Sequence, residues 1–278
     1  MIDETIFKNK YCALCSIYGG DDPGYFRLAL ESVVNQTAKI PIYIVVDGPI
    51  SAEYRAVLEK AKTDIERIFW IAENGGLGNA LNHGVMALKD KYDYVIRFDS
   101  DDINHEERFH HLILAIEKVG YDLLGSYIDE CAGYELEESI STRKVPLADD
   151  EIVSSIWRRN PFNHPSVAFR VTSVIEAGGY EEVAYFEDWY LWAKMIAKGS
   201  VVGNLGQSLV RFRYGDEMLG RRRGMHYMAC ELSFYRKLSK LKLVNQIKLV
   251  AIMLLRISTR ILPEGLFGLI YRWQRKFL

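Results

Sequence analysis

Three aspartates follow a single apolar segment almost without interruption. The stretch YVIRFDSDDIN, residues 94–104, places Asp99, Asp101 and Asp102 directly after the strand-like YVIRF. Carboxylates this close repel one another, so the cluster lowers stability unless a cation lies among them. Carboxylate oxygens are ligands that Mg²⁺ and Mn²⁺ prefer, and Mg²⁺ commonly completes its coordination with phosphate oxygens. The cluster therefore predicts a divalent metal site that binds a diphosphate-containing ligand.

Three different roles for the cluster fit these residues less well. An EF-hand loop would need an oxygen ligand, a glycine and a glutamate where the chain has Ile103, Asn104 and His110. A phosphatase with an aspartyl nucleophile usually carries its acidic pair after the first strand, not the fourth. A helix cap, which Asp102 or Asn104 could provide for the helix expected from Glu106, requires one carboxylate and not three.

Up to about residue 125, short apolar runs alternate with helical patterns. Strands are expected at 11–18, 41–48, 67–72 and 92–98, and helices at 21–36, 51–62, 77–89 and 106–119. Farther along the chain, HPSVAFR at 164–170 is expected as one more strand. Strands that are apolar on both faces and separated by crossover helices predict an α/β fold with a mostly parallel central sheet and flanking helices. Because ligands bind at the C-terminal ends of such strands, Asp47, Glu73–Gly76 and Asp99 are expected at one rim.

The glycine-rich segment ENGGLGNALNHG is a weak nucleotide signal by itself. A dinucleotide fingerprint would require glycine at position 81, which is leucine. The turn still allows the backbone to approach a ligand closely, and the adjacent helix N-terminus favours a phosphate. The chain has no Gly-Lys-Ser/Thr motif, which argues against a P-loop NTPase.

Together these motifs resemble the family 2 glycosyltransferases, which are inverting GT-A enzymes that use nucleotide-diphospho-sugars. The matching segments, in order from about residue 10 to 215, are SIYGGDDPGYFRLALESVVNQT, IVVDGP, NGGLGNALNHGV, RFDSDD, NHPSVAFR, GGY and EDWYLWAKM. The resemblance implies a GT-A (Rossmann-like) catalytic domain over residues 1–215. Residues 216–278 are then expected to form a helical, basic extension.

The resemblance also implies roles for individual residues. Asp47 matches the acid that recognises the base, usually uracil, and Asp188 in "ED" matches the catalytic base. Asp99 and Asp101 match the D-x-D motif that contacts the ribose and the metal, with Asp102 as a supporting acid, so these three are the candidate ligands of Mn²⁺ or Mg²⁺. Further candidates for binding the nucleotide-sugar are Ser16, Tyr18, Asn74, Gly76, Asn82, Ser100 and His164.

The chemistry of sugar transfer agrees with these roles. The departing diphosphate needs charge compensation, which a metal held by Asp101 supplies, and the acceptor hydroxyl needs a base on the opposite face of the sugar. Asp188 lies at an expected helix N-terminus, which favours its ionised form, although an ordinary helix cap is the alternative. His164 is equally compatible with a structural histidine. Many relatives have ARN at 80–82, where this chain has ALN, so nucleotide contacts from this helix stay open.

The charge of the chain is distributed unevenly. From Arg236 onward there are ten Lys and Arg residues and one acid, so this tail carries +9 while the preceding residues carry −11 of the net −2. Charges interrupt its apolar run before the roughly 18 residues that a membrane span requires. A basic helix lying in the membrane interface is predicted, with a hairpin packed on the catalytic domain as the alternative. Its apolar face would contain Leu243, Ile247, Val250, Leu254, Ile257 and Ile261, and Tyr271 and Trp273 would lie at headgroup level.

The remaining features concern location and partners. The start MIDETIFKNK lacks the pattern of a signal peptide, and the four cysteines do not form a disulfide framework. Cys12 and Cys15 are expected to be buried in a strand, not to bind zinc. A cytoplasmic protein, peripherally associated with the inner face of a bacterial cytoplasmic membrane, is predicted. Nucleic acid is not an expected partner, because no nucleic-acid-binding motif accompanies the basic tail.

The segments DSDD and NHPSVAFR are similar to those of bacterial surface-polysaccharide enzymes. This implies transfer of a hexose, galactose or glucose, from UDP to an N-acetylhexosamine on undecaprenyl diphosphate, commonly through a β1-3 link, in O-antigen or capsule biosynthesis. Arg221–Arg223 could close on the diphosphate. A non-catalytic sugar-nucleotide- or glycan-binding protein is one alternative, although it would not need the Asp188 base. A nucleotidyltransferase is another, although its phosphate loop near the first strand is missing.

Overall fold

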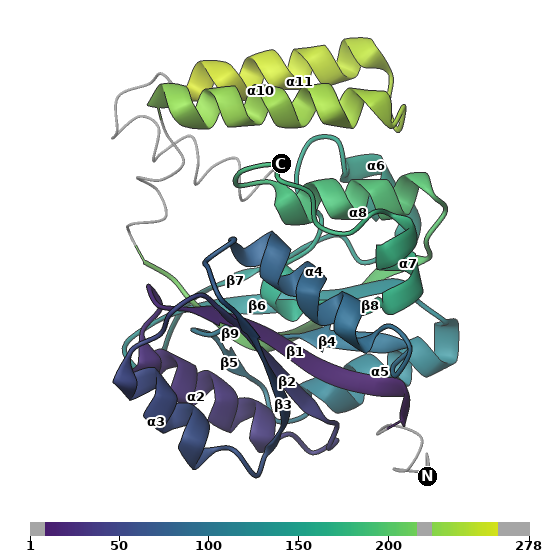
Figure 1. The fold of residues 1–278 in the computed structure, drawn as a ribbon. Helices are drawn as coiled ribbons and strands as arrows, with labels where there is room; N and C mark the ends of the chain where they lie inside the picture. The colour runs from purple at the N-terminus through teal and green to yellow at the C-terminus, as the bar shows by residue number, and fades with distance from the viewer. Residues whose placement is uncertain (1–8, 216–223, 261–278) are drawn as a thin grey trace.

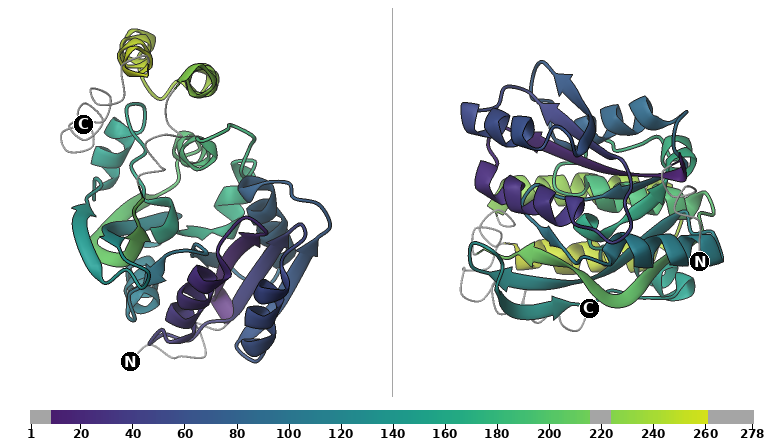
Figure 2. Two further views of the ribbon diagram at one scale, coloured as in Figure 1. Left: turned by 90° about the vertical axis from the view of Figure 1, so that its left-hand side faces the viewer. Right: turned by 90° about the horizontal axis from the view of Figure 1, so that it is seen from below.

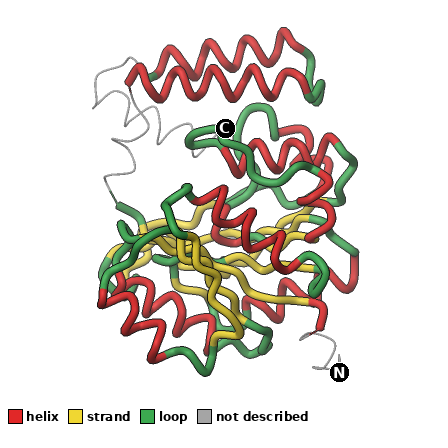
Figure 3. The backbone as a smooth tube through the Cα atoms, in the orientation of Figure 1, coloured by secondary structure: helices red, strands yellow, loops and turns green. Residues whose placement is uncertain are grey.

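The computed structural model describes residues 9–215 and 224–260, and the expectations for Arg221–Arg223, Ile261, Tyr271 and Trp273 lie outside these residues. A single sheet forms the centre of the described part, with helices on both of its faces (Figure 1, Figure 3). Its strands are β1 (Tyr11–Tyr18), β2 (Ile42–Asp47), β3 (Ile65–Ile71), β4 (Tyr94–Arg97), β5 (Ile103–Asn104), β6 (Leu123–Ala132), β7 (Glu138–Arg143), β8 (Ala168–Arg170) and β9 (Val202–Arg213). The helices are α2 (Pro23–Val34), α3 (Ala52–Lys60), α4 (Leu77–Leu88), α5 (Arg108–Val119), α6 (Asp149–Ser155), α7 (Val171–Glu176), α8 (Glu187–Ala197), α10 (Gly224–Lys240) and α11 (Gln246–Thr259).

The first four long strands make the parallel half of the sheet. The order is β3-β2-β1-β4-β8-β6-β9-β5, with β7 paired to β6. Strands β1 to β4 pair in parallel, and Tyr18, Asp47 and Ile71 lie in register at their C-terminal ends. Arg97 of β4 pairs with Leu14, so the chain leaves β4 toward Asp99 at the same rim. The predicted rim is therefore confirmed for the ends of β2, β3 and β4.

The second half of the sheet is mixed and was only partly predicted. Strand β8 is antiparallel to both β4 and β6, whereas β6 is parallel to β9. The segment HPSVAFR, expected as one strand, is a 3-10 turn at His164–Ser166 followed by the short β8. Pro165 explains the difference, because proline lacks the N–H that a sheet ladder needs and favours the start of a helical turn.

The two faces of β1 pack into two separate cores, as the side-chain alternation of a strand requires. Tyr11, Ala13 and Cys15 join α2, α3 and α5 on one face. Cys12 and Leu14 join α4 and α8 on the other. Cys12 and Cys15 are free and fully buried, so the prediction of core cysteines is confirmed.

Local signals in the sequence fix the ends of the early helices. The Asp22 carboxylate accepts hydrogen bonds from the backbone N–H groups of Gly24 and Tyr25, and Pro23 occupies the first turn of α2. At the start of α4, Gly76 has a φ of 87°, a conformation that favours glycine. These turns set the positions from which α2 and α4 approach the rim.

The C-terminal helices α10 and α11 lie side by side and pack on the body of the protein next to α8 (Figure 1, Figure 2). Phe234 of α10 contacts Phe186 and Trp189 at ring-centroid distances of 4.8 and 4.6 Å. The buried Glu231 forms ion pairs with Arg256 at 2.6 Å and Arg260 at 3.0 Å, which join α10 to α11. The hairpin alternative therefore describes how this region packs.

The outward face of α11 remains apolar. Ile247, Val250 and Leu254 of the predicted apolar stripe are 79, 47 and 59% exposed, and Leu255 beside them is 51% exposed. Leu243 and Ile257 of that stripe are partly buried. Leu249 instead faces inward and is buried. Among the described residues, every helix falls short of the length and apolarity needed to cross a bilayer.

Candidate active site

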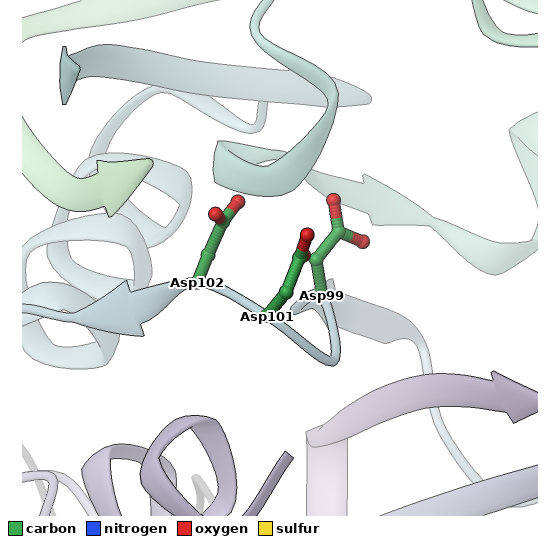
Figure 4. A group of neighbouring side chains, drawn as sticks. All are labelled: Asp99, Asp101 and Asp102. Atoms are coloured by element: carbon green, nitrogen blue, oxygen red, sulfur yellow. The ribbon is translucent and has the colours of Figure 1, made fainter. Parts of the chain in front are cut away.

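The three aspartates of the DSDD segment form one group at the end of β4. Their side chains project to the same side of the loop that joins β4 to β5 (Figure 4). One carboxylate oxygen from each of Asp99, Asp101 and Asp102 lies within 4.8 Å of the others. The predicted cluster is thus assembled in three dimensions, because a short turn keeps all three residues at the rim.

The donor set fits a divalent cation. Asp102 is buried, and its Oδ1 accepts a hydrogen bond from the Arg213 backbone N–H at 2.9 Å, whereas its buried Oδ2 has no partner among the described residues. A buried carboxylate oxygen without a partner is costly and is what a metal ion would satisfy. Three hard oxygen donors suit Mg²⁺ or Mn²⁺.

Burial and mutual repulsion raise the pKa values of this group. Burial raises the pKa of Asp101 to about 6, and the nearby charges of Asp99 and Asp21 add to that shift. The pKa of Asp102 is also raised well above its usual range, by burial first and then by Asp101 and Asp99. A bound cation would favour the ionised forms and remove this penalty.

Two cations support the cluster from the protein side. Arg97, buried at the end of β4, forms an ion pair with Asp99. Its Nε and Nη1 atoms have no hydrogen-bond partner in the described structure. Arg213 donates from Nε to the Asp101 carbonyl at 3.1 Å and lies over the Tyr25 ring. Arg97 and Arg213 therefore compensate only part of the negative charge of the cluster.

A cavity of about 410 Å³ connects the acidic cluster to the predicted catalytic base. Asp99, His164 and Asp188 all line it. Asp188 lies in the first turn of α8, where its Oδ2 accepts a hydrogen bond from Asn160 Nδ2 at 2.7 Å. Burial raises the pKa of Asp188, although the bonds from the Trp189 backbone and Asn160 oppose the shift. Residues almost ninety positions apart in sequence thus meet across one cavity.

Asp47 lies at the C-terminal end of β2, beside the glycine-rich turn. Its buried carboxylate accepts hydrogen bonds from the N–H groups of Gly75 and Gly76, both at 2.9 Å. Asn74 Nδ2 donates to the Asp47 carbonyl at 3.3 Å. Asp47 does not line the cavity that Asp99 shares with Asp188. In this structure its carboxylate holds the glycine-rich turn that begins α4.

Asn82 and His164 are both connected to Tyr180. The Asn82 side chain donates to the Tyr180 carbonyl at 2.7 Å and accepts from its N–H at 2.8 Å. This bidentate contact fixes the GGY segment. His164 Nε2 lies 3.1 Å from the Tyr180 hydroxyl, and burial lowers the pKa of the imidazole well below its usual range. His164 is therefore a neutral side chain in the cavity wall.

The other predicted residues lie along the rim. Ser16 is partly buried near the end of β1, and the neighbouring Tyr18 is 45% exposed. The Ser100 hydroxyl donates to Asp21 Oδ2 at 2.9 Å. Asp21 was not among the predicted site residues. Burial raises its pKa, and it adds a fourth carboxylate beside the cluster.

The sequence analysis missed Arg97 and Asn160 as well. A charged residue inside the apolar YVIRF was the available signal for Arg97, because an arginine in a buried strand needs an anionic partner. Asn160 carried no comparable signal. It reaches Asp188 only because the turn after α6 passes over the N-terminus of α8.

Comparison with known proteins agrees with this geometry. The family model for glycosyl transferase family 2 matches residues 18–177. A UDP-Gal:alpha-D-GlcNAc-diphosphoundecaprenol beta-1,3-galactosyltransferase of Escherichia coli is 32% identical over 98% of this chain and 98% of its own length. The amylovoran biosynthesis glycosyltransferase AmsE of Erwinia amylovora is 33% identical over 96% of this chain and 99% of its own.

Solved structures confirm the predicted GT-A fold. TarS 1-349 of S. aureus superposes with a TM-score of 0.65 at 13% identity, covering 90% of this chain and 71% of that chain. Its complex with UDP-GlcNAc gives a TM-score of 0.64 at 15% identity, covering 88 and 70%. With the family model and the similarity to full-length relatives, these findings show that the chain is a glycosyltransferase of glycosyl transferase family 2.

Proposed function

We propose that this enzyme transfers a hexose, galactose or glucose, from UDP to a lipid-linked N-acetylhexosamine with inversion at the anomeric carbon. The observation that carries the proposal is the shared cavity between Asp99 and Asp188. Inverting transfer requires charge stabilisation of the leaving diphosphate on one side of the sugar and a base on the other. An acidic metal site and a separate carboxylate on one cavity meet both requirements.

The acidic cluster forms the donor side in this proposal. Asp99, Asp101 and Asp102 would hold Mn²⁺ or Mg²⁺, and Asp99 would also contact the ribose. When bound, such an ion supplies positive charge to the leaving diphosphate. Asp21 and Ser100 keep the loop in place through their 2.9 Å hydrogen bond. Arg213 also holds the loop between β4 and β5 in place, because its Nε donates to the Asp101 carbonyl.

Asp188 is the proposed base. It removes the proton of the acceptor hydroxyl as that oxygen attacks the anomeric carbon. Asn160 donates to one carboxylate oxygen at 2.7 Å, which orients the carboxylate and leaves the other oxygen for the acceptor. Burial raises its pKa, which makes the carboxylate a stronger proton acceptor than a solvated aspartate.

The nucleotide would lie along the rim at the ends of β1, β2 and β3. Ser16 and Tyr18 end β1, and Asn74 and Gly76 begin α4. By holding the Gly75–Gly76 turn, Asp47 keeps backbone close to the expected position of the base. Asn82 would act indirectly, through its two hydrogen bonds to Tyr180.

The substrate assignment rests on the relatives. The Escherichia coli relative is named for transfer from UDP-Gal to GlcNAc-diphosphoundecaprenol with a beta-1,3 link. The similarity extends over nearly the whole of both chains, including α10 and α11. A UDP-sugar donor, an undecaprenyl diphosphate-linked acceptor and a β1-3 link are therefore the proposal for this chain, in O-antigen or capsule biosynthesis.

A lipid-linked acceptor places the enzyme at a membrane surface. The apolar stripe of Ile247, Val250 and Leu254 is exposed on α11, and Lys248 is close by on the same helix. Apolar side chains flanked by basic ones suit an interfacial helix on anionic lipid. We propose peripheral association with the inner face of the cytoplasmic membrane through this stripe.

A donor panel tests the proposal. Purified enzyme with Mn²⁺ is offered UDP-Gal, UDP-Glc, UDP-GlcNAc and GDP-Man, each with GlcNAc-diphospholipid as acceptor. We expect a disaccharide-lipid from UDP-Gal or UDP-Glc only, with a β-configured link in the NMR coupling constant. Transfer from the GDP-sugar, or an α-configured product, would contradict the proposal.

A further inference from the structure

The wall of the cavity also has a basic side. Six cationic side chains line the cavity together with Asp99 and Asp188: Arg143, Lys144, Arg158, Arg159, Arg256 and Arg260. They come from the end of β7, the turn after α6 and the C-terminal part of α11. None belongs to the motifs from which the donor site was predicted. The cavity therefore has an acidic side at Asp99 and a basic side, and Asp188 lines the same cavity.

The cations of this wall differ in what neutralises them. Arg256 and Arg260 are paired with the buried Glu231, so their charge is compensated by the protein. Arg158 and Arg159 have no comparable partner, and the Nε atom of each is buried without a hydrogen-bond acceptor in the described structure. Burial and the charge of Arg158 lower the pKa of Arg159. Two adjacent, half-buried guanidinium groups are thus left without an anionic partner among the residues that the structure describes.

The protein nevertheless holds this pair in place. The backbone N–H groups of Arg158 and Arg159 donate to the Ser155 carbonyl at the end of α6, at 3.0 and 3.2 Å. Arg256 Nη1 donates to the Arg158 carbonyl at 3.2 Å. The next residue, Asn160, is the one that binds Asp188. Positioning two unpaired guanidinium groups beside the base has a cost in stability, which a bound anion would offset.

We propose that Arg158 and Arg159 form the subsite for the diphosphate of the lipid-linked acceptor. Guanidinium groups are donors without acceptors, and their planar fork matches phosphate oxygens. The acceptor hydroxyl must lie at Asp188, and its diphosphate is separated from that hydroxyl by one sugar ring. Asn160 directly follows Arg159 and donates to Asp188, so one short segment links the two arginines to the proposed base. This inference rests on the proposed function and names the part of the acceptor that the enzyme recognises.

The proposed subsite also gives a function to α11, which lies between the cavity and the exposed apolar stripe. Ile252 and Arg256 of α11 line the cavity, while Val250 and Leu254 of the same helix are exposed on its outer side. Figure 2 shows α10 and α11 lying over the rest of the molecule on one side. An acceptor whose lipid tail lies in the membrane at the outer stripe would then have its diphosphate near the inner face of α11.

Acceptor kinetics test the subsite. We expect Arg158→Gln and Arg159→Gln each to raise KM for GlcNAc-diphospholipid about ten-fold, since each removes a charged hydrogen-bond donor. The same sugar on an uncharged alkyl chain should be used equally by variant and parent. UDP affinity and acceptor-independent UDP-sugar hydrolysis should be unchanged. Arg67→Gln, at an exposed arginine on β3, is the matched control, and Arg159→Lys should recover part of the loss.

Two results would overturn the subsite. One is an equal rise in KM for the charged and the uncharged acceptor, because the arginines would then act on the sugar or on the fold. The other is weakened UDP binding with an unchanged acceptor KM, which would assign the arginines to the donor diphosphate. Thermal unfolding of each variant shows whether it is folded. If a glutamine variant is misfolded, the acceptor kinetics of Arg159→Lys decide between these outcomes.

A binding assay separates failure of the subsite from failure of the proposed function. Geranyl diphosphate is titrated in the presence of EDTA, which removes any metal-dependent binding at the acidic side. The parent protein should bind it and the Arg158→Gln/Arg159→Gln double variant should not. If no UDP-sugar is transferred but this difference is found, the hexosyl transfer is wrong and the anion subsite stands. Equal binding by both proteins would refute the subsite.

Discussion

The two sides of the cavity are built in opposite ways. The acidic side comes from one stretch of four residues, 99–102, at the end of one strand. The basic side gathers residues from β7, the turn after α6 and α11, which lie more than one hundred positions apart. The first is a local arrangement that a short turn maintains. The second exists only because α11 folds back over α8.

The two sides are alike in where charge is left uncompensated. Arg97 pairs with Asp99, but one buried oxygen of Asp102 has no partner in the described structure. Glu231 neutralises Arg256 and Arg260, but Arg158 and Arg159 have no such acid among the described residues. In each case the compensated charges hold elements together. The uncompensated charges lie where a metal-diphosphate and a lipid diphosphate are proposed to bind.

Replacing Asp188, the proposed base, should have the largest effect. Asp188→Asn keeps the size of the side chain and its place beside Asn160 but cannot accept the proton. We expect kcat to fall by about 10³-fold, within the range for general base catalysis. The affinity for UDP, measured by calorimetry with Mn²⁺, should stay within a factor of two or so. Retention of most of the activity would remove Asp188 from the role of base.

Removing the buried acid of the basic side tests whether compensated charges hold the structure. Glu231→Gln leaves Arg256 and Arg260 without their anion, and breaking a buried pair costs about 3 kcal/mol. Urea unfolding should show this loss, whereas Glu53→Gln, at an exposed residue of α3, should change little. A stability close to that of the parent would mean that α10 and α11 are held mainly by their aromatic contacts.

The same pair predicts a pH dependence of stability. Burial opposes ionisation of Glu231, but Arg256 and Arg260 outweigh it, so its pKa is lowered in the folded protein. A lowered carboxyl pKa contributes stability that is present above the pKa of the unfolded chain and lost as the pH falls through the folded value. The difference between parent and Glu231→Gln should therefore narrow below about pH 4.

A change on the acidic side should affect the metal and the donor only. Asp101→Asn removes one charge of the cluster, and we expect about a 10²-fold loss of kcat/KM for the UDP-sugar. The concentration of Mn²⁺ needed for half-maximal activity should rise, while KM for the acceptor should not. Asp90→Asn, at an exposed aspartate after α4, is the control. A selective rise in acceptor KM would erase the proposed distinction between the two sides.

A smaller effect is expected for Asn160, which follows Arg159 and contacts Asp188. Asn160 donates to Asp188 and thereby opposes the rise in its pKa. Without that bond, Asn160→Ala should raise the pKa of Asp188 further, so a higher pH is needed to ionise the base. The acidic limb of the plot of kcat against pH should move to higher pH, and kcat at pH 7 should fall about ten-fold. An unchanged limb would show that another group controls the profile.

The smallest effect concerns the membrane. Replacing Ile247, Val250 and Leu254 by serine removes exposed apolar area without touching the cavity. We expect binding to vesicles with anionic lipid to weaken about ten-fold in a sedimentation assay. Val119→Ser, at an exposed valine of α5, is the control. Unchanged sedimentation of the triple variant would refute the role of the stripe.

Much of the parallel half of the molecule could be predicted from the sequence. Apolar runs such as YCALCSIY and IYIVVD can only be buried strands, and Asp22 with Pro23 marks the start of a helix because its chemistry is local. The contacts of Asp47 could not be predicted in the same way. Whether that carboxylate meets a ligand or two backbone N–H groups depends on how the Gly75–Gly76 turn packs.

The sequence by itself determined that three carboxylates lie within four residues at the end of a buried strand, because this placement is local. It also determined the basic character of the C-terminal region and the apolar stripe of α11. Only the tertiary structure decided that Asp188 and Asp99 line one cavity, that Asn160 holds Asp188, and that Arg158 lines the same cavity with no ion-pair partner among the described residues. Long-range packing brings such residues together, and a linear pattern of charge and hydrophobicity carries no information about which distant residues will meet.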